Sequence, residues 1–258
     1  VDGSFPLGGA VGAVSIASGM DPFLATLLAM LAGAAAGIVT ALLNVSLKIM
    51  ALLASILMMI ALYSINLRSM GRPNVIMEPP VFTVLQPEWL LEYVGRPLIL
   101  LAVVILAKLA LDAYFSTSQG LAIRATGSNP RMARAQGVNT GAMIILGMAV
   151  SNGLVGLAGA LYAQTQGGAD ISMGIGTIVI GLAAVIIGES ILPSRKLFML
   201  TLAVIIGAII YRFFIALALH SDFIGLKAQD LNLVTAVLVV IALVIPLFKQ
   251  RLARRRRI

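Results

Sequence analysis

Long stretches without a charged residue dominate this chain. They cover residues 22–47, 49–67, 135–169, 171–188 and 231–248. Two further apolar stretches are interrupted only by Lys108 and Arg212. A helix needs about 20 apolar residues to cross roughly 30 Å of hydrocarbon. Only 11% of the 258 residues are charged, against about a quarter in soluble domains. These features predict an integral membrane protein and exclude a soluble enzyme and a disordered chain.

The same stretches predict an all-α, polytopic membrane fold with seven full transmembrane helices. We expect these near residues 22–43, 49–66, 98–115, 141–163, 177–192, 197–218 and 232–249. An eighth apolar segment, Phe5–Gly19, contains Pro6 and a cluster of glycines. It either spans the membrane or forms a broken helix buried among its neighbours. Because the chain begins with Val1 and not with Met, we expect a single transmembrane domain over 1–258 that is truncated at its N-terminus.

The charges of the predicted loops indicate one orientation. Alternating helices place on one side the loops 44–48, 116–140, 193–196 and 249–258. These loops carry twelve Lys and Arg residues, against four in the opposite loops, 67–96 and 219–231. Positively charged loops are retained in the cytoplasm, so we expect the C-terminus there. No aromatic residue interleaves with the terminal arginines, which favours contact with anionic lipid over a nucleic-acid partner.

The predicted cytoplasmic loop 116–140 reads STSQGLAIRATGSNPRMARAQGVNT and is polar and long for a connection between helices. Ser128 or Asn129 can cap a helix that begins at Pro130, where proline loses no hydrogen bond. Gly137 can end that helix. The expected helix, 130–136, is about 10 Å long and too short to span a membrane.

This short helix would present Arg131 and Arg134 outward. A preceding helix over 119–126 would carry Arg124, with Gly127 as the break. A capped, basic helix between two spans suits docking in a groove of a cytoplasmic protein. A solvated loop that only fixes the topology is the other interpretation, and the caps favour docking.

Three segments resemble the permease subunits of ATP-binding-cassette (ABC) importers, in the branch that handles branched-chain amino acids and ribose-type sugars. They are GLAIRATGSNPRMARAQGVNT at 120–140, SNGLVGLAGALYAQTQGG at 151–168 and IGLAAVIIGE at 180–189. In such permeases the cytoplasmic loop is seated in a cleft of the ATPase. The resemblance implies this coupling role for Arg124, Gly127, Asn129, Arg131 and Gly137. The short helix adds Pro130, its expected first residue, and Arg134, which it would present outward.

The resemblance also implies the partners. It implies a permease dimer, with a second copy of the chain as the expected partner, in a bacterial-type plasma membrane. It further implies a cytoplasmic ATPase that binds ATP-Mg and an extracytoplasmic substrate-binding protein. The permease itself would hold no cofactor.

The opening VDGSFPLGGAVGA resembles a narrower group whose members import tryptophan, tyrosine or similar small amino-acid-like solutes. This implies an aromatic amino acid as the solute. An ABC permease for a sugar or a nucleoside is the alternative. An ion-coupled secondary transporter is a further alternative. It would need titratable groups near mid-membrane, and the chain offers few, because an arginine such as Arg212 does not release its proton at physiological pH.

Four residues of the predicted helices are candidates for the solute pathway. Asn152 either makes an interhelical hydrogen bond or lines the path. Gly156 and Gly159 suit either close packing or a wall that slides. Arg212 either faces the path or extends to the outer interface.

Catalytic chemistry is not expected of this chain. It shows no nucleophile–base pair, no metal-ligand cluster and no GxxxxGK[ST] motif for nucleotide phosphates. Lys108 and Asp112 lie four residues apart and are expected to pair on one helix. We therefore predict a transport subunit, with ATP hydrolysis left to a partner.

Overall fold

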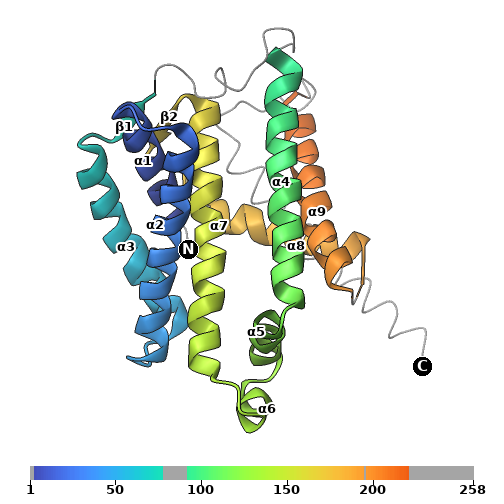
Figure 1. The fold of residues 1–258 in the computed structure, drawn as a ribbon. Coiled ribbons are helices and arrows are strands. Elements are labelled where there is room, and N and C mark those ends of the chain that lie inside the picture. The colour runs from blue at the N-terminus through green and yellow to red at the C-terminus, as the bar shows by residue number, and fades with distance from the viewer. Residues whose placement is uncertain (1–2, 78–91, 195, 221–258) are drawn as a thin grey trace. The chain divides into compact units, whose positions relative to one another are not determined.

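The computed structural model describes residues 3–77, 92–194 and 196–220. They form two compact units, Val1–Ile175 and Gly176–Ile258, which are described in turn (Figure 1). The elements of the first unit are α1 (Ser4–Ala17), α2 (Pro22–Val45), α3 (Ala51–Met70), β1 (Asn74–Ile76), α4 (Glu92–Ser116), α5 (Ser118–Ser128), α6 (Pro130–Ala135), α7 (Thr140–Gln166) and β2 (Gly168–Asp170). Those of the second unit are α8 (Thr177–Ile191) and α9 (Leu197–His220).

Among the described residues, five helices are long and apolar enough to cross a membrane, namely α2, α3, α4, α7 and α9. Each matches a predicted span. The span expected near 177–192 is a shorter helix, because α8 has 15 residues and rises only about 22 Å, less than the hydrocarbon thickness. The span expected near 232–249 lies outside the described residues. α4 begins before Pro97 and carries this proline inside the helix.

Two connections lie at the same end of the first unit, as the loop alternation predicts. α2 ends at Val45, and α7 begins at Thr140. A Cβ added to Gly141 would lie 3.0 Å from the Val45 side chain. The α2–α3 turn therefore lies beside the segment that joins α4 to α7, which Figure 1 also shows.

Helix α1 is a continuous helix of 14 residues that is largely buried and packs against α2, α3 and α7. Pro6 lies in its first turn, where proline is tolerated. A Cβ on Gly8 would overlap the carbonyl group of Gly156 on α7. A Cβ on Gly33 of α2 would likewise overlap the carbonyl oxygen of Asn152. The small residues thus let three helix backbones approach closely. The structure supports burial of this segment among its neighbours, but the expected break is absent, because α1 is continuous from Ser4 to Ala17.

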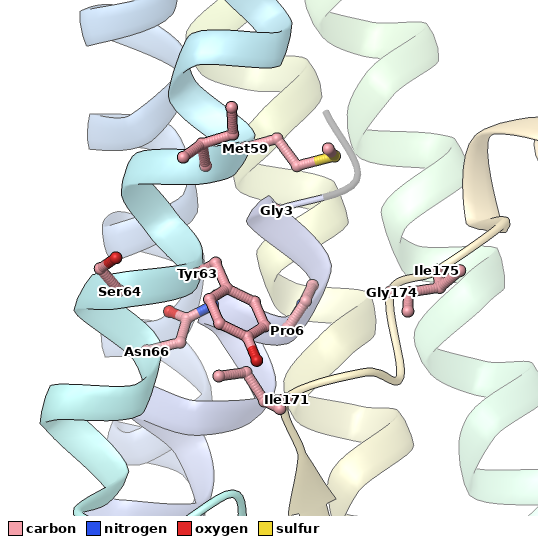
Figure 2. A pocket seen from close by; sticks show the side chains of 10 residues that line it. Gly3, Pro6, Met59, Tyr63, Ser64, Asn66, Ile171, Gly174 and Ile175 are labelled. Carbon is pink, nitrogen blue, oxygen red and sulfur yellow. The ribbon is translucent and has the colours of Figure 1, made fainter.

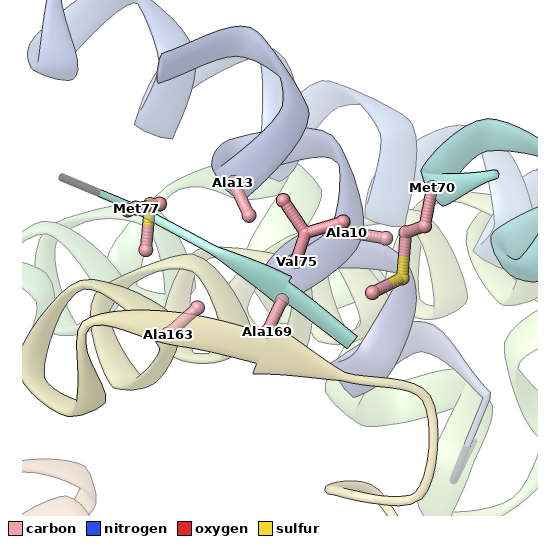
Figure 3. Packing of buried hydrophobic residues seen from close by; sticks show 7 residues of the cluster. All are labelled: Ala10, Ala13, Met70, Val75, Met77, Ala163 and Ala169. Carbon is pink, nitrogen blue, oxygen red and sulfur yellow. The ribbon is translucent and has the colours of Figure 1, made fainter. Parts of the chain in front are cut away.

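A two-stranded antiparallel sheet closes the other end of the first unit. Val75 of β1 pairs with Ala169 of β2. A buried cluster joins α1, α3 and α7 to both strands (Figure 3). Its members are Ala10, Ala13, Met70, Val75, Met77, Ala163 and Ala169. The sheet is an addition to the predicted all-α fold, and it fixes the end of α3 to the end of α7.

The second unit contains the α8–α9 pair. A Cβ on Gly188 of α8 would overlap the carbonyl group of Ala203, and one on Gly207 of α9 would overlap that of Ala184. Tyr211 is buried in a cluster with Ala183 and Ile215. Glycines on both helices therefore bring the two backbones into contact, by the same principle as in the first unit.

Candidate functional site

The polar segment 116–140 folds as two short helices between α4 and α7. Thr117 caps α5, because its side-chain oxygen accepts the N–H of Gly120 at 3.3 Å. A Cβ on Gly120 would overlap the backbone of Phe115, so only glycine permits this sharp turn from α4 into α5. α5 also packs on α7, where a Cβ on Gly147 would lie 3.5 Å from Ile123.

The break between the two helices lies two residues later than the sequence predicts. α5 runs through Gly127 to Ser128, so the prediction of a break at Gly127 is wrong. Helix interiors tolerate glycine at a modest cost, and the chain turns instead at Asn129, whose φ of −151° is extended. Gly127 is exposed, and a Cβ there would meet nothing within 4 Å. Its missing side chain therefore serves no contact among the described residues.

The predicted caps of the second short helix are present. The Asn129 side chain accepts the N–H of Met132 at 3.1 Å, and Pro130 occupies the first helical position. α6 ends at Ala135, and Gly137 follows it in the left-handed conformation at φ 81°. The segment is thus ordered by its own sequence, as the cap pattern predicts.

Arg134 joins the second short helix to α7. Its guanidinium donates a hydrogen bond to the Thr140 hydroxyl at 2.9 Å. Thr140 is the first residue of α7 and is buried. Next to it, the Asn139 side chain accepts the N–H of Ala142 at 3.2 Å and caps α7. The bond therefore connects α6 with the first residue of a membrane-length helix.

The outer surface of the segment combines basic and apolar side chains. Arg131 and Arg134 are exposed, as the sequence predicts, and Arg124 is exposed as well. Leu121 and Met132 are also exposed, although both are large and apolar. Exposed apolar groups flanked by cations are typical of a surface that a protein partner covers.

Asn152, a predicted pathway residue, lies between helices. It is 2% exposed, and its side-chain oxygen accepts a hydrogen bond from the Ser4 hydroxyl at 2.9 Å. Its amide nitrogen donates to the carbonyl of Met148 at 2.9 Å. These contacts support the interhelical interpretation and connect α7 with the start of α1.

Gly156 and Gly159 also lie at helix contacts. A Cβ on Gly156 would lie 2.6 Å from the carbonyl oxygen of Ala29 on α2. One on Gly159 would overlap the carbonyl oxygen of Phe5 on α1. Both positions are buried, so these glycines form the packed centre of the first unit.

The charged residues of the membrane-length helices fall in both units. Arg212 is exposed on α9 and belongs to the second unit. Lys108 and Asp112 of α4 form the predicted ion pair, with 2.6 Å between ammonium nitrogen and carboxylate oxygen. Both side chains are largely buried. In such an environment an unpaired charge is most unfavourable, so pairing stabilises the two side chains.

Two residues of the site were missed by sequence analysis, Gly120 and Thr140. Gly120 is the third residue of α5, a position at which a glycine signals a close approach of two backbones. Thr140 follows the cap residue Asn139, and that cap pattern marks the start of α7. No local sequence pattern predicts the hydrogen bond between Thr140 and Arg134.

Comparisons with known proteins agree with this arrangement. A family model described as "Branched-chain amino acid transport system / permease component" matches residues 1–245. A tyrosine transport system permease protein of Clostridioides difficile (strain R20291) is 40% identical over 240 residues, which cover 93% of this chain and 78% of the relative. An uncharacterized protein of Rickettsia prowazekii (strain Madrid E) is 34% identical over 255 residues, which cover 94% of this chain and 85% of that protein.

A third relative matches a smaller part of the chain. The nucleoside ABC transporter permease protein NupC of Lactococcus lactis subsp. cremoris (strain MG1363) is 38% identical over 87 residues, which cover 33% of this chain and 27% of the relative. No solved structure matches the chain significantly. The family match runs through both compact units and their membrane-length helices. The chain is therefore a multi-pass membrane protein and a transport subunit, and it belongs to the family of permease components of branched-chain amino acid transport systems.

Proposed function

We propose that this chain forms the solute passage of an ABC importer for an aromatic amino acid. The observation that carries the proposal is the 40% identity, over 93% of the chain, to a permease of a tyrosine transport system. A separate ATPase that binds ATP-Mg supplies the energy, and an extracytoplasmic binding protein delivers the solute. A second copy of the permease completes the passage.

In this proposal the segment 116–140 is the coupling element and faces the cytoplasm. Arg124 and Arg131 are exposed there together with large apolar side chains, which supports docking on a protein. The bond from Arg134 to Thr140 connects the docked helix with α7. Closure of the ATPase would then move α6 and α7 together, as a rigid-body or hinge transition requires.

The pathway role of Asn152, Gly156, Gly159 and Arg212 is part of the same proposal. Close contacts join α1, α2 and α7 around the first three. Such a packed group moves as one body. Its surface, and not the buried glycines, would then form the wall of the passage. Arg212 is a separate candidate, because it is a charged and exposed residue of a membrane-length helix.

A nucleoside is the second candidate solute. It rests on the nucleoside permease relative, which matches 33% of the chain, whereas the tyrosine system permease matches 93%. Helix packing and coupling are shared by importers of different solutes, so a partial match carries less information about the solute than one along the whole chain. We therefore favour the amino acid.

Uptake by membrane vesicles tests the proposal. The complete permease, its ATPase and its binding protein are produced together, and uptake of labelled tyrosine and labelled adenosine is measured with and without ATP. We expect ATP-dependent tyrosine uptake and an ATPase that copurifies with the permease. Tyrosine uptake that persists without ATP, in a preparation lacking any ATPase, would favour an ion-coupled transporter and contradict the proposal.

A further inference from the structure

A cavity of about 450 Å³ lies within the first unit, between the start of α1, the second half of α3 and the loop that follows β2 (Figure 2). Pro6 of α1 and Met59 and Tyr63 of α3 line it on one side. Ile171 and Ile175 line it on the other. It is large enough for a small-molecule ligand, for which pockets typically measure about 300–1,000 Å³.

The cavity lies at membrane depth. Its α3 residues, from Met59 to Asn66, are about 12 to 22 Å along the helix from Ala51, between the centre of this 20-residue span and the end that leads to β1. The loop 171–175 is not helical, and it lines the same cavity. Non-helical backbone occurs at this depth where it is packed in protein or lines a water-filled space, and transporters bind their solutes in such places.

The chemistry of the cavity is mainly apolar, with one buried amide beside it. Asn66 is 1% exposed, and its side-chain oxygen has no hydrogen-bond partner among the described residues. Figure 2 shows the nitrogen of this amide beside the ring of Tyr63, on the side of Pro6, while the oxygen points the opposite way. A buried acceptor without a partner is unfavourable, and a donor that enters the cavity would remove this cost after a rotation of the amide.

We propose that this cavity is the membrane-level binding site for the side chain of the imported solute, an inference that rests on the proposed function. An aromatic ring fits against Pro6, Met59 and Ile171, which exclude water from its faces. The phenol hydroxyl of a tyrosine-like solute donates its hydrogen bond to the Asn66 side-chain oxygen. The site therefore prefers a phenol to a phenyl ring, because the unmodified ring leaves the amide unpartnered.

The chain contains no cysteine, so single thiols can report occupancy. Ile60→Cys places a thiol on the cavity wall. Ile65→Cys is the matched control, because Ile65 lies on the same helix, is similarly exposed and does not line the cavity. In the complete transporter, the rate of reaction with a small methanethiosulfonate reagent is measured with tyrosine, phenylalanine or adenosine present.

We expect tyrosine to slow the reaction of Ile60→Cys at least tenfold and to leave Ile65→Cys unchanged. Phenylalanine should protect only at a concentration about tenfold higher. Asn66→Leu keeps the volume but removes the acceptor, so it should abolish this difference between the two amino acids. An unchanged reaction rate of Ile60→Cys without solute, in the Asn66→Leu background, shows that the fold is intact.

The outcomes separate the site from the proposed function. Protection by adenosine and not by tyrosine would confirm the cavity as the solute site but contradict the amino acid as the solute. ATP-dependent tyrosine uptake without any protection of Ile60→Cys would overturn the cavity proposal and leave the proposed function standing. Equal protection by tyrosine and phenylalanine in the unsubstituted Asn66 background would overturn the role of Asn66.

Discussion

At the residue scale, the short helix α6 shows both the reach and the limit of sequence reasoning. Asn129 and Gly137 could be assigned as its caps, because cap chemistry acts over two to four residues. The hydrogen-bond partner of Arg134 could not be assigned from the sequence. Its bond with Thr140 forms only when the chain folds back onto the start of α7, and the sequence at Arg134 equally fits a solvated cation.

Replacement of Thr140 by valine tests whether that bond transmits movement. Valine has nearly the same shape but cannot accept the hydrogen bond from Arg134. We expect ATP hydrolysis by the complex to continue while solute uptake falls about tenfold, which corresponds to about 1.4 kcal/mol. The measurement is the ratio of solute imported to ATP hydrolysed.

Thr165→Val is the matched control for this experiment. Thr165 lies near the other end of α7 and its hydroxyl donates to the carbonyl of Tyr162 within the same helix. This variant should transport normally. If Thr140→Val also keeps the normal ratio, the bond with Arg134 has no part in coupling.

At the element scale, membrane-length helices were the most predictable feature. Charged residues are rare in membrane spans because burying a charge in lipid is unfavourable. Stretches without charge therefore predict spans, and five of the predicted spans are helices of adequate length. The short strands β1 and β2 were not predictable. Three residues each give no alternating pattern, and their pairing depends on α1 and α7 holding the two segments together. The length of α8 was overestimated because apolar composition alone does not mark where a helix stops.

The packing of α7 against α1 and α2 gives a prediction at this scale. Gly156→Ala places a methyl group 2.6 Å from the Ala29 carbonyl oxygen, and the backbones must separate. We expect a loss of stability of about 1–3 kcal/mol, the usual cost of overpacking. The measurement is the Tm of the purified permease in detergent.

Gly147→Ala is the control on the same helix. Its added methyl group would meet only Ile123, at an ordinary distance of 3.5 Å. Alanine is favoured over glycine inside a helix by roughly 0.5–1 kcal/mol, so the Tm should stay the same or rise. Equal losses in both variants would show that the close contact at Gly156 is unimportant.

At the scale of the whole molecule, the arrangement of charge is the main guide to orientation. The α2–α3 turn and segment 116–140 share one end of the first unit, as the alternation of loops predicts. Segment 116–140 carries three arginines, and the opposite end carries Arg68 and Arg72 before β1. Charge therefore predicts a cytoplasmic end only as a sum over loops, whereas the family match identifies the chain as a permease component.

Reversal of one charge on the proposed coupling surface separates docking from folding. Arg131→Glu should weaken binding of the ATPase and lower uptake at least tenfold, because a carboxylate replaces an exposed cation at a protein contact. Arg72→Glu makes the same change at the other end of the first unit and should leave ATPase binding unaffected. Copurification of the ATPase with each variant is the measurement, and equal amounts in both would contradict the docking role.

The most direct test of the coupling role is a cross-link from the cysteine-free chain. A single Arg131→Cys, or Arg72→Cys as its counterpart, is labelled with a photoreactive thiol reagent in membranes that contain the complete transporter. The account predicts that Arg131→Cys cross-links to the ATPase and that Arg72→Cys does not. A cross-link to the ATPase from Arg72→Cys, with none from Arg131→Cys, would contradict it.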